Sequence, residues 1–77
     1  MENFYENKAD ALIKLFLKSI KDGKSSEELE AVRAGFIAES YREYRNAGFF
    51  AVSAEYFSWA LNEAYRSKAG VLFSLSA

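Results

Sequence analysis

Cysteine, histidine and proline are all missing from this chain of 77 residues. Without cysteine the chain forms no disulfide bonds, and this absence is typical of proteins in a reducing compartment, so we expect a cytoplasmic protein. Without cysteine and histidine it lacks the preferred ligands of zinc and the usual nucleophile–base pairs of hydrolytic enzymes. We therefore predict a non-catalytic protein with no metal and no cofactor.

Long apolar runs and an excess of one charge are missing as well. No stretch approaches the ~18 uninterrupted apolar residues of a membrane-spanning helix, so the sequence predicts no membrane partner. The net charge of −1 gives little long-range attraction to nucleic acid. No glycine-rich phosphate loop is present, and no small-molecule substrate is evident. These absences favour a protein that binds other proteins.

The composition that remains is that of a folded domain, with 51% hydrophobic and 17% aromatic residues. Residues 1–77 are long enough for a single domain only. A domain of this size buries a small fraction of its surface, and it often needs a disulfide, a metal or oligomerisation for stability. We therefore expect either dense packing or self-association.

Helical periodicity predicts an all-α fold, a small three-helix antiparallel bundle made of a helical hairpin plus an N-terminal helix. The first helix is expected over residues 4–21. The second follows Ser25, which forms a capping box with Glu28, and it ends near residues 45–48. The third is expected over residues 50–68, before a short apolar C-terminal tail. The predicted core positions are Tyr5, Ala9, Leu12, Ile13, Phe16, Leu17 and Ile20 in the first helix, Leu29, Phe36, Ile37, Ser40 and Tyr44 in the second, and Phe50, Ser53, Ala54, Phe57, Ala60, Leu61 and Ala64 in the third.

The second helix also carries a flank of small residues around a glycine. Glycine in a helix interior costs about 1 kcal/mol relative to alanine. The close approach of another backbone is the usual compensation, so we expect such a contact here. The flank consists of Ala31, Ala34, Gly35 and Ala38.

The third helix has apolar side chains on two faces, because five of the thirteen residues in 49–61 are aromatic. Exposed apolar patches mark interaction sites, and tryptophan and tyrosine are enriched among the residues that dominate interfaces. We therefore predict that the second face binds a partner protein or another copy of the chain. The open alternative is that the tail, or Phe4 and Leu15, covers this face within one chain. The predicted interface residues are Phe49, Val52, Tyr56, Trp59, Glu63 and Arg66.

Residues 37–61 carry Tyr44, Gly48, Phe50, Phe57 and Ala60 at characteristic spacings. In these positions the segment resembles a single tetratricopeptide unit. It departs from that family at Tyr41 and Ser53, and no second unit follows it. The resemblance implies an antiparallel helical hairpin and supplies no binding residues.

A nucleic acid is the alternative partner. Basic residues interleaved with aromatic ones, as in the segment "YREYR" at 41–45, can contact phosphates and stack on bases. A pI near 5.4 argues against this interpretation, because nucleic-acid-binding domains are usually basic. The alternative contact residues are Lys14, Lys18, Lys21, Arg42 and Arg45.

A pair of carboxylates gives a third possibility. Glu39 and Glu43 lie one helical turn apart, and two carboxylates on one face can bind a hard cation such as Mg²⁺. Arg42 and Arg45 flank them, so the favoured interpretation is a solvated, charged margin of the helix.

Overall fold

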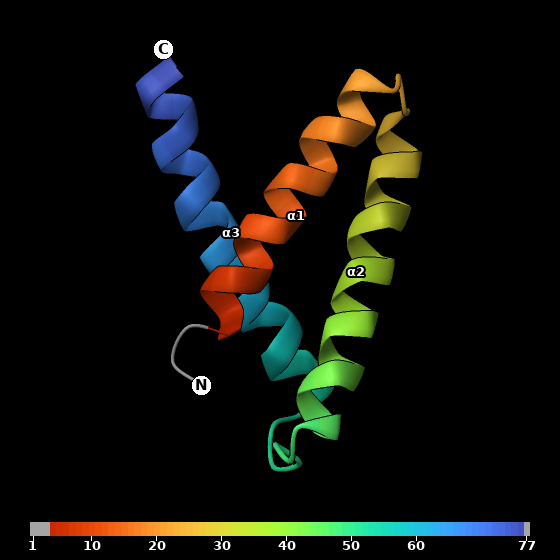
Figure 1. The fold of residues 1–77 in the computed structure, drawn as a ribbon, viewed down its shortest axis with the longest axis vertical. Coiled ribbons are helices and arrows are strands. Elements are labelled where there is room, and N and C mark those ends of the chain that lie inside the picture. The colour runs from red at the N-terminus through yellow and green to blue at the C-terminus, as the bar shows by residue number, and fades with distance from the viewer. Residues whose placement is uncertain (1–3, 77) are drawn as a thin grey trace.

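The computed structural model describes the backbone of residues 4–76 and the side chains of residues 4–70. Three helices follow one another along this part of the chain: α1 (Phe4–Lys21), α2 (Ser26–Asn46) and α3 (Ala54–Ser76). Successive helices run in opposite directions, and the C-terminal halves of α1 and α3 diverge (Figure 1). Residues 4–76 contain no strand, so the predicted all-α bundle is confirmed.

The first two helices have the predicted ends. Gly23, with a φ of 81°, lies in the turn after α1. The Ser25 side chain accepts a hydrogen bond from the Glu28 N–H at 3.2 Å, and the Glu28 carboxylate accepts one from the Ser25 N–H at 2.9 Å. This reciprocal pair is the predicted capping box. Gly48, with a φ of 105°, follows the C-terminus of α2 and takes a backbone conformation that other residues rarely adopt.

The third helix differs from the prediction at both ends. It begins at Ala54 and not at Phe50, because the Ser53 hydroxyl accepts a hydrogen bond from the Tyr56 N–H at 3.1 Å and so occupies the N-cap position. It then continues through Gly70 to Ser76. The predicted helix end at residue 68 is therefore wrong, since the backbone of the apolar tail extends α3; the side chains of this tail lie outside the described residues.

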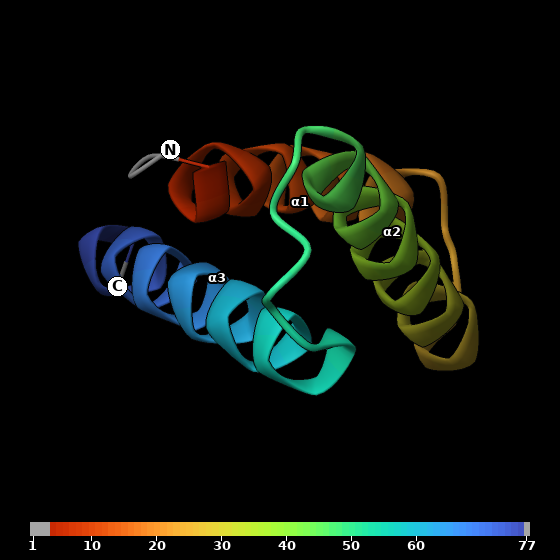
Figure 2. The same cartoon turned by 90° about the horizontal axis from the view of Figure 1, so that it is seen from below.

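The core is an aromatic cluster to which all three helices contribute. Phe57, Leu61 and Ala9 have no exposed surface. The ring of Tyr44 lies 5.3 Å from that of Phe57, between centroids, and the ring of Tyr5 lies 5.4 Å from Phe57 and 5.8 Å from Tyr44. α1 crosses α3 (Figure 1), and α2 stands at one side of that pair (Figure 2). The core therefore occupies one end of the bundle, where the helices converge.

Five predicted core residues are exposed instead: Leu17, Ile20, Phe50, Ser53 and Ala54. Ser53 and Ala54 are exposed because they lie at the N-terminus of α3, before its first turn reaches the core. Leu17 and Ile20 are 57% and 59% exposed, because the end of α1 that carries them has diverged from α3 (Figure 1). Phe50 is 67% exposed, because it precedes α3 and helical spacing does not apply to it. The guanidinium carbon of Arg45 lies 5.9 Å from the centre of the Phe50 ring.

The small-residue flank of α2 also differs from the prediction. Ala31, Ala34, Gly35 and Ala38 are all exposed. A Cβ added at Gly35 would find no heavy atom within 4 Å, so no other backbone of the chain packs there. The expected close contact is therefore absent among the described residues.

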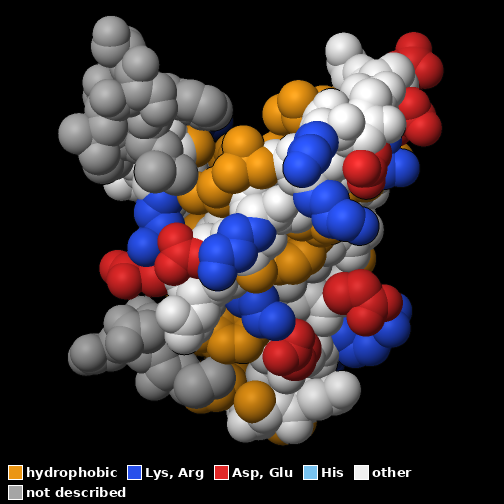
Figure 3. All heavy atoms as spheres, turned by 45° about the horizontal axis from the view of Figure 1, so that its top comes forward, with side chains coloured by type: hydrophobic (Ala, Val, Ile, Leu, Met, Phe, Trp, Pro, Cys, Tyr) orange, Lys and Arg blue, Asp and Glu red, His pale blue; other side chains and the backbone are white. Residues whose placement is uncertain are grey.

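Two ion pairs tie α1 to its neighbours. The Lys8 ammonium lies 2.7 Å from the Glu43 carboxylate on α2, and Asp10 lies 3.2 Å from Lys68 on α3. On the face drawn in Figure 3, basic and acidic side chains are interspersed with exposed hydrophobic ones. No helix within residues 4–76 is both long enough and apolar enough to cross a membrane.

Candidate interaction surface on the third helix

The side of α3 turned away from the core forms one continuous exposed face. Its residues recur every three or four positions, the spacing that keeps side chains on one side of a helix. Phe57 and Leu61, which are buried, lie on the opposite side. We call this surface the α3 outer face; it consists of Tyr56, Trp59, Glu63, Arg66 and Gly70, all of them exposed.

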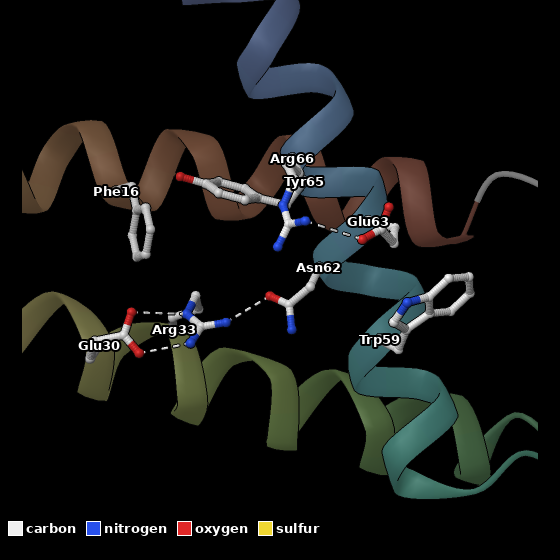
Figure 4. A pocket seen from close by; sticks show the side chains of 8 residues that line it. All are labelled: Phe16, Glu30, Arg33, Trp59, Asn62, Glu63, Tyr65 and Arg66. Atoms are coloured by element: carbon white, nitrogen blue, oxygen red, sulfur yellow. Dashed lines mark hydrogen bonds and ion pairs between the residues drawn. The ribbon is translucent and has the colours of Figure 1, made fainter.

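Two aromatic rings dominate the α3 outer face. Tyr56 and Trp59 are 54% and 59% exposed, and their ring centroids lie 5.8 Å apart. In Figure 4 the indole of Trp59 points away from α2 and from the polar residues between the helices. Apolar surface of this size on one helical turn is unusual in a solvated helix face.

No described segment of the chain covers these rings. The tail was one candidate cover, but it continues α3 in the same direction and so leads away from Trp59. Phe4 and Leu15 were the other; the Phe4 ring packs in the core, 4.8 Å from that of Tyr44, and Tyr56 and Trp59 remain more than half exposed with Leu15 in place. The alternative in which the chain covers its own aromatic face is therefore not supported by the described residues.

The polar part of the surface is an ion pair. Glu63 and Arg66 lie one turn apart with 3.5 Å between carboxylate and guanidinium, and their side chains are 48% and 78% exposed. An exposed pair of this length contributes little to the stability of the helix. Both groups are therefore available to a partner at little cost.

Two predicted interface residues lie elsewhere. Phe49 stacks on Tyr44 with 4.6 Å between ring centroids, and Val52 packs against the same core cluster. The Val52 carbonyl also accepts a hydrogen bond from the Tyr41 hydroxyl at 2.8 Å. Both residues precede Ala54, so the helical spacing that grouped them with Tyr56 does not hold. Conversely, Gly70 belongs to the surface and was missed, although it stands four residues after Arg66.

A groove of about 450 Å³ runs beside this surface, between α2 and α3 (Figure 4). Its centre is polar: Arg33 on α2 donates to the Asn62 side-chain oxygen at 2.7 Å and makes two hydrogen bonds to Glu30. Hydrogen bonds from Arg33 hold the pKa of the Glu30 carboxyl below its usual value. The charged groups in the groove are therefore already paired with each other. Its lining residues are Phe16, Glu30, Arg33, Trp59, Asn62, Glu63, Tyr65 and Arg66.

The basic residues of the nucleic-acid alternative do not come together. Lys14, Lys18 and Lys21 are exposed on the second half of α1, and Arg42 and Arg45 lie on the last turns of α2. Because α1 and α2 are antiparallel, these two sets lie at opposite ends of the pair (Figure 1). Arg42 is also 3.1 Å from the Glu39 carboxylate. The sets therefore form no single basic surface.

The two carboxylates considered as a cation site each form an ion pair with a different basic residue. Glu39 pairs with Arg42 on its own helix, and Glu43 pairs with Lys8 on α1. Within the part of the chain that the structure describes, no three acidic residues are close enough to hold a metal ion.

Comparisons with protein-family models, with curated proteins and with solved structures found no match for this chain.

Proposed function

We propose that this protein is a small non-catalytic interaction or regulatory protein, an adaptor or an inhibitor, that self-associates through the α3 outer face. One observation carries the proposal: Tyr56 and Trp59 are adjacent, more than half exposed and uncovered by any described segment. Aromatic residues in such positions are the usual anchors of interfaces. A cytoplasmic location, expected from the absence of cysteine, is part of the same proposal.

The expected affinity is modest. Aromatic side chains bury 150–250 Å² each, so covering the exposed half of each ring removes roughly 100 Å² from water. Four such rings in a dimer give about 10 kcal/mol at ~25 cal/mol per Å². Association itself costs about 4–15 kcal/mol, which leaves at most about 6 kcal/mol, so we expect a dissociation constant of tens of micromolar or weaker and not a permanent complex.

The test is the substitution Trp59→Glu, with Phe50→Glu as a matched control. Both rings are more than half exposed, but Phe50 lies outside the α3 outer face. Sedimentation equilibrium should find wild type and Phe50→Glu self-associated and Trp59→Glu monomeric. Circular dichroism should find all three helical. Association of Trp59→Glu with wild-type affinity, or its unfolding at every concentration, would contradict the proposal.

Nucleic-acid binding through Lys14, Lys18, Lys21, Arg42 and Arg45 is the alternative function. Of these residues, only Lys14, Lys18 and Lys21 on α1 form a continuous exposed row. The alternative is therefore a contact with nucleic acid through this row alone. Its test is a filter-binding assay at several salt concentrations, because phosphate contacts make affinity fall steeply with salt. Affinity that is absent, or independent of salt, would eliminate the alternative.

A further inference from the structure

We infer that the occupant of the α3 outer face is the same face of a second copy. The two α3 helices pair antiparallel about a two-fold axis, with Glu63 of each copy opposite Arg66 of the other and Trp59 opposite Gly70. This inference rests on the proposed function and specifies its partner and register.

The spacing of the surface is that of a two-stranded helical interface. Tyr56, Trp59, Glu63, Arg66 and Gly70 are separated by three, four, three and four residues. This alternation places residues at the a and d positions of a heptad repeat, which keeps them in line along a second helix. The spacing fixes which positions of a second helix these residues would meet.

The charges select the antiparallel orientation. In a parallel pair, equivalent residues would meet, so Glu63 would face Glu63 and Arg66 would face Arg66. In an antiparallel pair, a and d positions face each other, and an axis midway between Glu63 and Arg66 brings opposite charges together twice. A two-fold axis of this kind also closes the assembly at two copies.

The same axis places a large side chain opposite an empty position. Trp59 stands four residues before Glu63, and Gly70 stands four residues after Arg66, so pairing the charges puts each indole opposite the Gly70 of the other copy. The two positions were not used to choose the axis. Their match is therefore an independent agreement between shape and charge.

Among the described residues, nothing within a single chain requires glycine at position 70. It lies inside α3, where glycine costs about 1 kcal/mol relative to alanine. It is exposed, no positive φ requires it, and a Cβ added there would find no heavy atom within 4 Å. Without a side chain at this position, the helix backbone offers a flat surface on which an indole ring can pack. The pairing therefore accounts for a residue that the isolated fold leaves unexplained.

The flanking positions permit close approach of the two helices. Ala60 and Ser67 border the surface on one side, and Asn62 borders it on the other. None of the three carries a charge, and the first two are small. Such flanking side chains would shield the central ion pairs from solvent only partly.

Charge reversal tests the register. Glu63→Arg and Arg66→Glu each place like charges opposite one another in the dimer, and each should weaken self-association by about tenfold or more, because opposed like charges are costly at an interface. The double variant Glu63→Arg/Arg66→Glu restores opposite charges and should return to within about threefold of wild type. Affinity is followed by sedimentation and by the emission of Trp59, the chain's one tryptophan, which should shift to the blue as the protein is concentrated.

A substitution at Gly70 tests the second contact. Gly70→Gln should raise the melting temperature of the monomer, because glutamine favours the helix, yet weaken association by about tenfold, because the side chain displaces the indole. Gly35→Gln, the same substitution at an exposed glycine inside α2, should also raise the melting temperature but should leave association unchanged.

The outcomes separate the inference from the proposed function. Association that is lost in Trp59→Glu but insensitive to both charge reversals would overturn the register and leave the proposed function standing. Failure of the double variant to recover, with both single variants impaired, would also overturn the register. A wild-type chain that is monomeric at millimolar concentration would overturn both.

Discussion

Phe57 is the side chain on which the packing of all three helices depends. It has no exposed surface, and the rings of Tyr5, Tyr41 and Tyr44 lie within 5.4 Å of it, between centroids. Phe57→Ala would leave a cavity at the point where the helices converge. We expect it to cost about 3–5 kcal/mol, enough to unfold a domain of this size.

Phe50→Ala is the natural comparison, because it removes the same ring from an exposed position. It should change the free energy of unfolding by less than about 0.5 kcal/mol. Urea denaturation followed by circular dichroism measures both. Similar losses from the two variants would mean that the core is not centred on Phe57.

Tyr5 makes stability depend on pH in the alkaline range. Burial, together with the nearby phenol of Tyr44, raises the pKa of Tyr5 from 10.0 to about 12. The folded state therefore keeps a proton that the unfolded chain releases, so stability is complete below pH 10 and falls as the pH rises from 10 to about 12. Burial also raises the pKa of Tyr65, which adds to the same trend.

The variant Tyr5→Phe keeps the ring and removes the titrating hydroxyl. Its stability should fall less steeply than that of the wild type between pH 10 and 12. Urea midpoints measured at intervals of pH test this. Parallel curves for the two proteins would show that Tyr5 is not the group responsible.

The sequence identified core residues well inside the helices and failed where a helix ends or diverges. Phe57 and Leu61 are buried as predicted, because a residue in mid-helix has its direction set by spacing alone. Leu17 and Ile20 have the right spacing as well, yet they are exposed. Their burial depends on the path of α3, which residues of α1 do not determine.

At the scale of the element, the start of α2 is set by a local motif. Ser25 and Glu28 satisfy each other's backbone donors, and these hydrogen bonds lower the pKa of the Glu28 carboxyl. Ser25→Ala removes the cap and should cost about 1 kcal/mol, whereas Ser26→Ala, one position into the helix, should cost less than about 0.5 kcal/mol. Thermal unfolding of both variants measures the difference. Equal losses would argue against the capping box.

The ends of α2 and α3 differ in how far the sequence could predict them. The capping box lies within four consecutive residues, so it could be predicted from the sequence alone. The start of α3 depends on Ser53, which was assigned to the core face while its hydroxyl in fact caps the helix. The far end was misplaced because Gly70 stands inside α3, although glycine usually follows a helix C-terminus.

At the scale of the whole molecule, the fold exposes α3 because its three helices converge at one end only. The cluster around Phe57 fills that end. Leu17 and Ile20 lie on the part of α1 that extends past the cluster, and the α3 outer face lies on the side of α3 opposite to it. The sequence predicted an exposed aromatic face from the number of rings. It could not divide the apolar side chains of this segment between core and surface, because Phe49 and Val52 reach the core only through the connection before Ala54.

Self-association of such a molecule should make its stability depend on concentration. A dimer that binds the folded state and not the unfolded chain raises the free energy of unfolding by mass action. Above the dissociation constant, each tenfold increase in concentration contributes about 0.7 kcal/mol per chain, or roughly 3–5 °C in the melting temperature of a domain this small. We expect this slope for the wild type, for Phe50→Glu and for the double charge reversal.

Trp59→Glu should melt at a temperature that does not change with concentration, equal to that of the wild type at high dilution. The comparison separates the two ways in which Trp59 could matter. If the indole were part of the core, Trp59→Glu would melt lower than dilute wild type at every concentration, since a buried charge destabilises the monomer itself. If it lies only at the interface, the two curves meet at dilution and part as the protein is concentrated, and the point at which they part gives the dissociation constant.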